Sequence, residues 1–431
     1  MPFSVTIQRL IPGGRGYGLY EGRPVFVPLS APGDHILVRS VKDRKSYIEA
    51  LEFEVLQPSP VRKLPPCPHF GICGGCDLQQ IEEGTQLSAK REILVDALQR
   101  IGKIQFLASE IKSTPSPFWH YRNRIQLKVK WDGDQLVWGF YRTGTHEIAL
   151  LNDCLITLTP LWLFSERLMK WLNARYLLMN GHTSVEILQG DNEEFLVEFQ
   201  LESQQASDED LAGIIREFDR AWFRQASTYV SQRFGRSILV TGRGFVSKTV
   251  GDLVYQVGQG SFFQVNELML STLRNCASVE ATGRTALDLF SGVGFFSLAL
   301  ARRFDQVLAV ELSPSSGRDL RRNLVLNRFS NCQLFTQEAT VFLREHRNRL
   351  RALDLVLLNP PRAGLPMDTV AEVACLRAPL VVYVSCDPTT LSRDLGVFLK
   401  HQYEVSSLEI LDLFPQTHHF ETVAKLRRVC A

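Results

Sequence analysis

The spacing of hydrophobic and polar residues changes twice along this chain, and each change predicts a different kind of structure. Over residues 1–60, short β-branched runs such as 24–27 and 35–41 are separated by Gly and Pro turns. Short strands about ten residues apart are typical of a small all-β domain, and we expect a small barrel here. The proline-rich stretch 57–66 is expected to be a linker.

The middle of the chain mixes a helical stretch with alternating strands. Apolar residues recur at helical spacing over 86–101, which predicts a helix. Residues 124–130 and 184–188 alternate between apolar and polar side chains, as half-buried strands do. We therefore expect a central α+β domain over 61–255, with its helical stretch 86–110 packed on the domain that follows.

After residue 256 the pattern alternates between apolar strands and helical stretches. The predicted strands include 286–290, 307–311, 353–358 and 379–385. Such alternation is typical of a parallel sheet covered by helices. The predicted fold class is therefore multidomain, with an N-terminal OB-like β-barrel, a central α+β domain and a C-terminal α/β Rossmann-like domain over 256–431.

Composition adds little beyond this picture. The 431 residues are 45% hydrophobic and 22% charged, with a net charge of +2, which is ordinary for globular domains. No apolar run approaches the ~20 residues that a membrane-spanning helix needs, and the first ten residues lack the pattern of a signal peptide. We expect a cytoplasmic protein with no membrane partner.

A Gly-rich turn follows the first strand of the C-terminal domain, in the sequence Asp-Leu-Phe-Ser-Gly-Val-Gly that begins at Asp288. Gly292 and Gly294 allow the backbone to pass close to a ligand. Glu311 follows Asp288 by 23 residues, a distance at which an acid typically binds ribose hydroxyls. A dinucleotide fingerprint would place a third Gly where this chain has Ser297, which favours S-adenosylmethionine (SAM) over a nicotinamide cofactor. A structural turn without a ligand is the alternative.

Two later strands end in sequences that carry chemistry, Asn359-Pro-Pro-Arg362 and Ser-Cys386-Asp-Pro. The carboxyl ends of parallel strands meet at one crevice. A thiolate that adds to C6 of a pyrimidine makes C5 nucleophilic enough to accept a methyl group, and a base must then remove the C5 proton. Glu421, which follows two histidines, is the candidate base. Amino methylation would need an aromatic residue at Arg362, and the absence of a cysteine beside the prolines favours uracil over cytosine.

Together these residues resemble the RNA uridine-C5 methyltransferase family over essentially the whole chain. Gly13-Gly-Arg-Gly, 25–28 and 31–34 resemble the family's TRAM domain, an OB-like RNA-binding barrel. The resemblance implies that Cys386 is the nucleophile and Glu421 the general base. The residues that it implies for SAM binding are Gln264, Phe290, Glu311, Glu338 and Asn359.

The chain departs from the family pattern at two cofactor positions. Asn359 stands where Asp is common, and it lacks the negative charge that would attract a sulfonium. Phe295 stands where Asn is common, which removes one polar contact. We expect the affinity for SAM to differ accordingly.

Four cysteines form a further candidate site, in the pattern Cys67-x5-Cys73-x2-Cys76 with Cys154 later in the chain. Nine cysteines in this length are too sparse for a disulfide scaffold. Four thiolates suit either zinc or an iron–sulfur cluster, and their spacing does not separate the two. The resemblance implies a [4Fe–4S] cluster with a structural or RNA-positioning role. The remaining cysteines are expected to be core or incidental residues: Cys276, Cys332, Cys375 and Cys430.

RNA is the expected partner. Basic and aromatic residues interleave over 118–130, as in strands that track phosphates and stack bases, although an amphipathic edge strand would look the same. Phe262 and Phe263 could line a pocket for the target uracil or belong to the core. The resemblance implies 23S ribosomal RNA as the substrate, with the tRNA T-loop as the alternative. Nothing in the sequence demands more than a monomer. A non-catalytic iron–sulfur RNA-binding protein is the rival interpretation.

Overall fold

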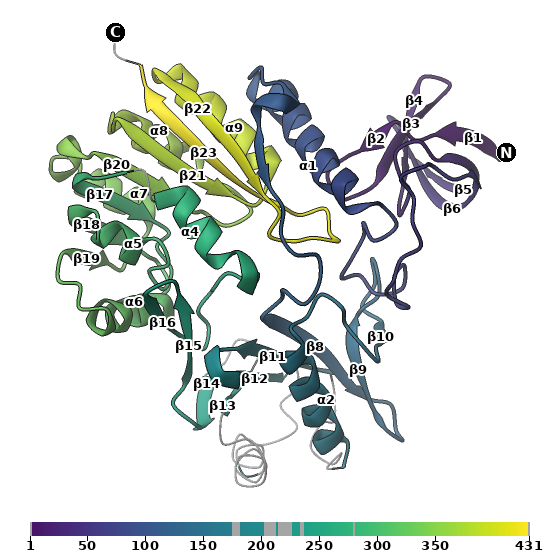
Figure 1. Ribbon diagram of the computed structural model, residues 1–431, viewed down its shortest axis with the longest axis horizontal. Helices are drawn as coiled ribbons and strands as arrows, with labels where there is room; N and C mark the ends of the chain where they lie inside the picture. The colour runs from purple at the N-terminus through teal and green to yellow at the C-terminus, as the bar shows by residue number, and fades with distance from the viewer. Residues whose placement is uncertain are drawn as a thin grey trace.

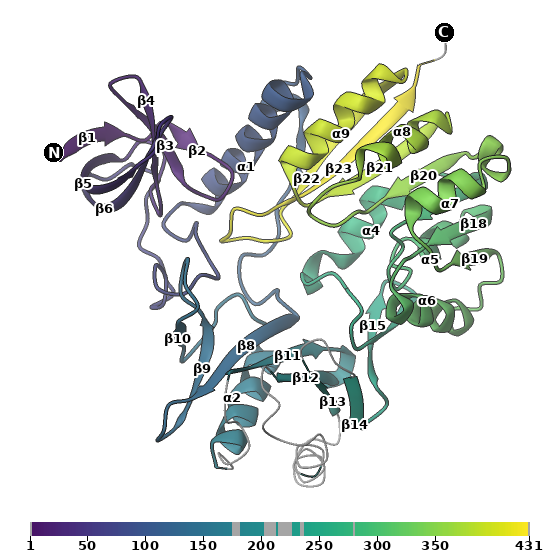
Figure 2. The ribbon, with the colours of Figure 1, turned by 180° about the vertical axis from the view of Figure 1, so that it is seen from behind.

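A computed structural model describes residues 2–174, 182–201, 213, 226–232, 237–278 and 281–429. Three bodies follow one another along the chain (Figures 1 and 2). The first is a six-stranded sheet at the N-terminus, the second a seven-stranded sheet from the middle of the chain, and the third a larger body with an eight-stranded sheet. The multidomain fold class predicted from the sequence is thus confirmed.

The N-terminal body is built from short strands whose alternate residues face one core. The strands are β1 (Phe3–Thr6), β2 (Arg9–Leu10), β3 (Gly16–Tyr20), β4 (Arg23–Val27), β5 (His35–Asp43) and β6 (Ile48–Gln57), in the order β1-β5-β6-β4-β3-β2. The core side chains are Val5, Ile7, Val25, Val27, Ile36, Val38, Ile48 and Ala50. This body corresponds to the predicted barrel, since β1 also packs against β3.

The central sheet has one face covered by a helix. Its strands are β8 (Arg124–Trp131), β9 (Leu136–Tyr141), β10 (Ile148–Leu150), β11 (His182–Gln189), β12 (Phe195–Leu201), β13 (Ala226–Gln232) and β14 (Ser237–Thr241), in the order β10-β9-β8-β11-β12-β13-β14. The helix α2 (Thr159–Asn173) begins with a proline in its first turn, where a missing N–H costs nothing. Its apolar side packs against Ile125, Leu127 and Val129 of β8.

The segment after the linker belongs structurally to the third body. It contains α1 (Glu83–Ala97), a π-helical turn η1 (Leu98–Gly102), η2 (Ala108–Glu110) and β7 (Lys112–Thr114). Ile93 and Leu94 of α1 share one core with Leu391 and Leu395 of α9 (Pro388–Lys400), and β7 pairs with β22 at the sheet edge. The helical stretch that the sequence places within 61–255 therefore packs on the C-terminal sheet.

The eight-stranded sheet has the order β19-β18-β17-β20-β21-β23-β22-β7. Its other strands are β17 (Gly283–Leu289), β18 (Phe304–Val310), β19 (Cys332–Phe335), β20 (Leu355–Leu358), β21 (Leu380–Ser385), β22 (Tyr403–Leu411) and β23 (Glu421–Arg428). The strands β19, β18, β17, β20 and β21 run parallel to one another, whereas β23 lies antiparallel between β21 and β22. The sequence predicted the parallel part but not this insertion.

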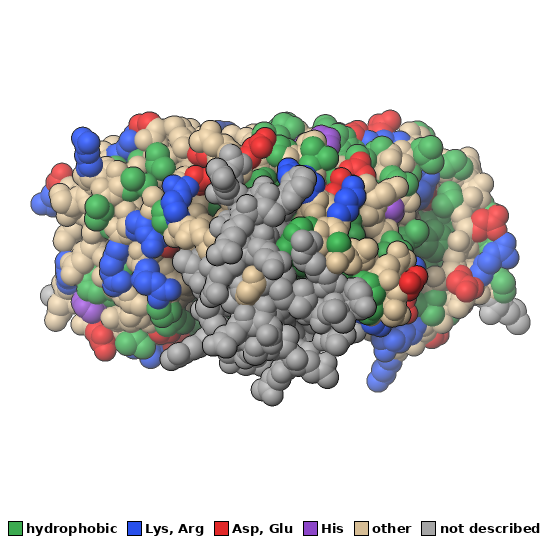
Figure 3. Space-filling model, turned by 90° about the horizontal axis from the view of Figure 1, so that it is seen from below, with side chains coloured by type: hydrophobic (Ala, Val, Ile, Leu, Met, Phe, Trp, Pro, Cys, Tyr) green, Lys and Arg blue, Asp and Glu red, His purple; other side chains and the backbone are tan. Residues whose placement is uncertain are grey.

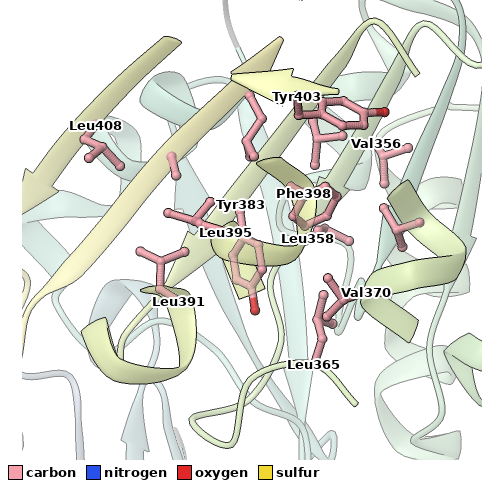
Figure 4. Packing of buried hydrophobic residues seen from close by; sticks show 14 of the residues in the cluster. Val356, Leu358, Leu365, Val370, Tyr383, Leu391, Leu395, Phe398, Tyr403 and Leu408 are labelled. Atoms are coloured by element: carbon pink, nitrogen blue, oxygen red, sulfur yellow. The ribbon is translucent and has the colours of Figure 1, made fainter. Parts of the chain in front are cut away.

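Helices cover both faces of that sheet. They are α4 (Leu270–Ser278), α5 (Ser297–Ala301), α6 (Pro314–Leu326), α7 (Ala339–Glu345), α8 (Met367–Cys375) and α9, with the short turns η5 (Glu267–Met269) and η6 (Arg349–Ala352). A two-stranded ribbon of β15 (Phe245–Val250) and β16 (Leu253–Gly258) packs against α6. Figure 4 shows Val356, Leu358 and Tyr383 of the sheet packed against Phe398 of α9 and Val370 of α8.

The surface carries mixed charge. On the face seen in Figure 3, basic, acidic and hydrophobic side chains are interspersed around the atoms drawn in grey, in keeping with the small net charge. Within the described residues, no helix has the length and apolar character needed to cross a membrane.

Candidate active site

A cleft of about 1090 Å³ collects side chains from the central and C-terminal bodies. Residues at or just after the ends of β17, β18, β20 and β21 meet residues of the central sheet there. Every site residue that the sequence predicts lines this one cleft: Cys67, Cys73, Cys76, Cys154, Gln264, Phe290, Glu311, Glu338, Asn359, Cys386 and Glu421. The four cysteines, which lie in a different segment of the sequence, therefore share a cavity with the reaction centre.

The Gly-rich turn after β17 is shaped to approach a ligand. Phe290, Gly292 and Gly294 all have positive φ, at 64°, 56° and 90°, and a Cβ atom on Gly292 would meet open space. Glu311 follows β18 and accepts hydrogen bonds from the backbone N–H of Gly292 (2.8 Å) and of Ser313 (2.6 Å). Each carboxylate oxygen keeps a free lone pair, so Glu311 can also accept from ribose hydroxyls.

Two further predicted cofactor residues lie at the ends of regular elements: Glu338 at the start of α7 and Asn359 just after β20. Glu338 caps α7, since its carboxylate accepts from the backbone N–H of Thr340 and Val341. Burial raises the pKa of Glu338, but these donors outweigh it and lower the pKa overall. Asn359 follows β20 directly and donates its backbone N–H to Leu289 (3.4 Å). Both side chains face the cleft beside the turn.

Phe295, the departure noted in the sequence, belongs to an aromatic core. It is 6% exposed and contacts the rings of Tyr255, Phe263 and Phe296. The Tyr255 hydroxyl donates to the carbonyl of Phe295 (3.0 Å). The Phe295 side chain therefore supports the turn by packing and offers no polar group to a cofactor.

Cys386 and Glu421 are brought together by strand register. β21 ends at Ser385, which pairs with Thr422 of the antiparallel β23. One further step places Cys386 opposite Glu421, the first residue of β23. The sequence indicated that both residues belong to one crevice, and the antiparallel strand explains why they lie next to each other.

The electrostatics of this pair depend on Arg362. Glu421 is 4% exposed, and burial raises its pKa to about 8 although the positive charge of Arg362 lowers it. Burial, together with the negative charge of Glu421, raises the pKa of Cys386 to about 11, and Arg362 again acts in the opposite direction. Arg362 is therefore the cation that favours the deprotonated form of both groups.

A neutral imidazole completes this corner of the cleft. Burial, with the charges of His418 and Arg362, lowers the pKa of His419 to about 3, so His419 is uncharged at neutral pH. Sequence reasoning treated the two histidines only as neighbours of Glu421, and it used Arg362 only to exclude amino methylation. The sequence pattern that could have identified His419 as a site residue is the stretch Phe-Pro-Gln-Thr-His-His-Phe-Glu, which ends at Glu421.

The four cysteine side chains are partly buried and close to one another. Burial raises the pKa of Cys73 to about 11, and negative charge on Cys154 or Cys67 would raise it further. Burial likewise raises the pKa of Cys76 and of Cys154. Within the described part of the chain, no group of three or more His, Cys, Asp or Glu side chains is arranged to hold a metal ion.

The other cysteines lie apart from this group. Cys276 and Cys332 pack against the core of the large sheet, as expected for core residues. Cys375 is exposed at the end of α8. Cys430 lies outside the described residues.

The central sheet presents polar and aromatic groups to the same cleft. Arg122, Gln126 and Tyr141 line it, and Lys128 lies 5.1 Å from the ring centre of Tyr141. Because β8 lies between β9 and β11, the edge-strand interpretation of this segment is wrong. Both candidate aromatics line the cleft. Phe263 is 2% exposed and belongs to the core, whereas Phe262 is 59% exposed.

Comparisons with known proteins show which family the chain resembles. A family model described as tRNA (uracil-5-)-methyltransferase matches residues 82–429, and a TRAM-domain model from tRNA (uracil(54)-C(5))-methyltransferase matches residues 3–61. A 23S rRNA (uracil(1939)-C(5))-methyltransferase, RlmD, of Shewanella amazonensis is 31% identical over 98% of this chain and 94% of its own length. An uncharacterized RNA methyltransferase of Aquifex aeolicus is 30% identical over 99% of this chain and 98% of its own length.

A solved structure resembles the whole fold. It is the tRNA (uracil-54, C5)-methyltransferase of Pyrococcus abyssi in complex with S-adenosyl-L-homocysteine, which is 26% identical. The two structures superpose with a TM-score of 0.75 over 98% of this chain and 100% of the other. Proteins named for ribosomal RNA and for tRNA thus both share this architecture.

Proposed function

Because the chain belongs to the tRNA (uracil-5-)-methyltransferase family and is a SAM-dependent RNA uracil-C5 methyltransferase, we propose that it methylates C5 of a uridine in 23S ribosomal RNA through a covalent adduct with Cys386. The observation that carries the chemistry is the register that sets Cys386 opposite Glu421 beside the Gly-rich turn. Similarity to the ribosomal RNA enzymes over nearly the full chain supports the choice of substrate.

In the first step, the Cys386 thiolate adds to C6 of the uracil. The Sγ–C6 bond forms, and the electron pair of the C5–C6 double bond moves onto C5 and O4. Arg362 favours the thiolate by its positive charge. The target base has to leave its stack to reach the cleft, and the exposed ring of Phe262 is placed to stack on it.

SAM, when bound, supplies an electrophilic methyl group to C5, with the electron pair of the broken S–CH3 bond staying on its sulfur. The residues proposed to hold it are those beside the turn, where Glu311 can accept from the ribose hydroxyls. The other members of this set are Gln264, Phe290, Glu338 and Asn359.

In the last step, Glu421 takes the proton from C5. The C–H electron pair re-forms the C5–C6 double bond, and the Sγ–C6 bond breaks with its electron pair returning to the Cys386 sulfur. A general base works best when its pKa lies near the working pH, and the raised pKa of Glu421, about 8, fits that requirement.

The four cysteines are proposed to hold a [4Fe–4S] cluster. Four partly buried thiols close to one another are a suitable ligand set. One zinc ion also takes four thiolates, and we propose the cluster because the family resemblance implies it.

The cluster proposal predicts about four iron and four sulfide per chain in protein purified without oxygen. Cys73→Ser is expected to lose most of this iron, because serine replaces a thiolate ligand. The matched control is Cys375→Ser, at an exposed cysteine, which should keep the full content. Stoichiometric zinc without sulfide would contradict the proposal.

The substrate proposal is tested with methyl-labelled SAM and unmodified 23S ribosomal RNA or tRNA, followed by nucleoside mass spectrometry. We expect 5-methyluridine in ribosomal RNA only. Label in tRNA alone would show that the substrate is tRNA, with its T-loop uridine as the expected target. If the protein bound both RNAs but labelled neither, the non-catalytic interpretation would be favoured. The proposal includes a cytoplasmic monomer.

Arg362 is expected to set the pH dependence of the reaction. Replacing it with glutamine removes the charge that lowers the pKa of both Glu421 and Cys386, so both pKa values rise. The deprotonated pair then forms only at higher pH, and the rising limb of kcat/KM against pH should move up by about one unit. Arg362→Lys keeps the charge and should stay near the wild-type profile. An unshifted profile for Arg362→Gln would show that Arg362 does not act on these groups.

A further inference from the structure

The loop 412–420, which joins β22 to β23 and leads directly into Glu421, is anchored from outside its own strands. The buried Lys90 of α1 donates to the Asp412 carboxylate (2.6 Å) and to the carbonyl of Phe414 (3.1 Å). The Tyr121 hydroxyl donates to the carbonyl of Pro415 (2.9 Å). Figures 1 and 2 show this loop reaching across to α1. The position of the base is therefore set by segments that precede the Rossmann-like sheet.

The centre of the loop is fastened to the segment that follows Cys76. The carbonyl of Gln416 accepts the backbone N–H groups of both Asp77 (3.1 Å) and Leu78 (3.0 Å). Gln416 is fully buried with φ at +67°, a backbone conformation that L residues rarely adopt and that neighbouring contacts must hold in place. Gln86 of α1 adds two more hydrogen bonds to it.

A side-chain contact ties the same segment to the end of the loop. Nδ1 of His418 lies 2.6 Å from the Asp77 carboxylate. The His418 ring contacts that of His419 at a tilt of 41°, with centres 3.9 Å apart, and His419 lines the cleft two residues before Glu421. Gly14 of the barrel packs against the Asp77 carboxylate, since a Cβ atom at Gly14 would lie 2.9 Å from it.

From these contacts we infer that Asp77 is a positioning residue for the base: its carboxylate holds His418 and its backbone N–H helps to hold Gln416, so that Glu421 at the end of loop 412–420 faces the reacting C5. The inference rests on the proposed function. It gives the cysteine segment a defined part in the reaction, because Asp77 directly follows Cys76: that segment aligns the proton-abstraction step. Addition of Cys386, which is carried by β21, does not depend on this loop.

The test separates methyl transfer from proton loss in single-turnover reactions. RNA tritiated at uracil C5 reports proton loss by tritium release, and methyl-labelled SAM reports methyl transfer. In Asp77→Ala and in His418→Ala, we expect methyl transfer near the wild-type rate but tritium release slowed by about tenfold or more, as for a catalytic group displaced by a fraction of an ångström to 1 Å. The adduct between Cys386 and RNA should accumulate on denaturing gels.

Asp77→Ala and His418→Ala each remove one partner of the same contact. His418→Ala leaves the cysteine segment unchanged, so it distinguishes loss of loop position from loss of the cysteine site. Asp252→Ala, which removes an exposed ion pair with Arg302, is the matched control and should behave like wild type. Equal slowing of both steps, or no slowing in either variant, would overturn the inference. A wild-type reaction without 5-methyluridine would overturn the proposed function itself, and the inference with it.

Discussion

Replacing Cys386 with alanine is expected to abolish 5-methyluridine formation while leaving the fold and SAM binding intact. Uracil C5 is too weak a nucleophile to take the methyl group unless a thiolate has first added to C6. Loss of a catalytic nucleophile lowers turnover by several orders of magnitude. The side chain lies at the end of β21, facing the cleft, and it is not part of the packed core clusters, so truncation should cost little stability.

The measurement is methyl transfer from labelled SAM into RNA, with thermal unfolding and SAM titration on the same protein. Cys375→Ala is the matched control, because Cys375 is exposed at the end of α8 and should retain full activity. Substantial turnover by Cys386→Ala would rule out the covalent route. An unfolded variant is distinguished by its melting curve, and Cys386→Ser, which preserves size but is a far weaker nucleophile, then provides the same test.

The convergence of the site was predictable because of one property of parallel sheets. Asn359 and Cys386 each follow an apolar strand, and the Gly-rich turn follows another, so their carboxyl ends had to meet at one edge. The periodicity of the sequence is sufficient for that step. The individual roles of Gln264 and Glu338 came only from the family resemblance, since neither carries a signal in its local pattern.

The approach of the cysteine site to the reaction centre was not predictable from pattern. Cys76 and Cys154 lie far from Cys386 in the sequence, and no periodic feature links them. The contact arises from pairs such as Asp77 with His418, separated by more than three hundred residues, and from the buried pair of Lys90 with Asp412. Such long-range polar contacts depend on the assembled domains, whereas hydrophobic spacing reports only local structure.

The antiparallel direction of β23 was also not predicted from the sequence, although it places Glu421 beside Cys386. Its residues read as an ordinary apolar strand, and alternation gives no strand direction. Only the pairing of Ser385 with Thr422 shows that Glu421 begins the strand opposite Cys386. A parallel strand in the same place would have carried its first residue to the far edge of the sheet, away from the nucleophile.

That placement makes Glu421→Gln the most informative single substitution in the chain. Glutamine has the same shape but is not basic enough to take the C5 proton, so addition and methyl transfer should proceed while elimination fails. We expect turnover to fall by about 10²–10⁴-fold, the usual contribution of a general base. The methylated RNA should remain covalently attached to Cys386 and migrate with the protein on a denaturing gel.

Two further variants and two alternative outcomes for Glu421→Gln decide the interpretation. Glu404→Gln, at an exposed glutamate on β22, should turn over normally without an adduct. The double variant Cys386→Ala with Glu421→Gln should give no adduct, which identifies the attached sulfur. Normal turnover by Glu421→Gln would assign the base elsewhere. An adduct without a methyl group would show that Glu421 acts before methyl transfer, for example by positioning the uracil, and not in the elimination that its place opposite the thiol predicts.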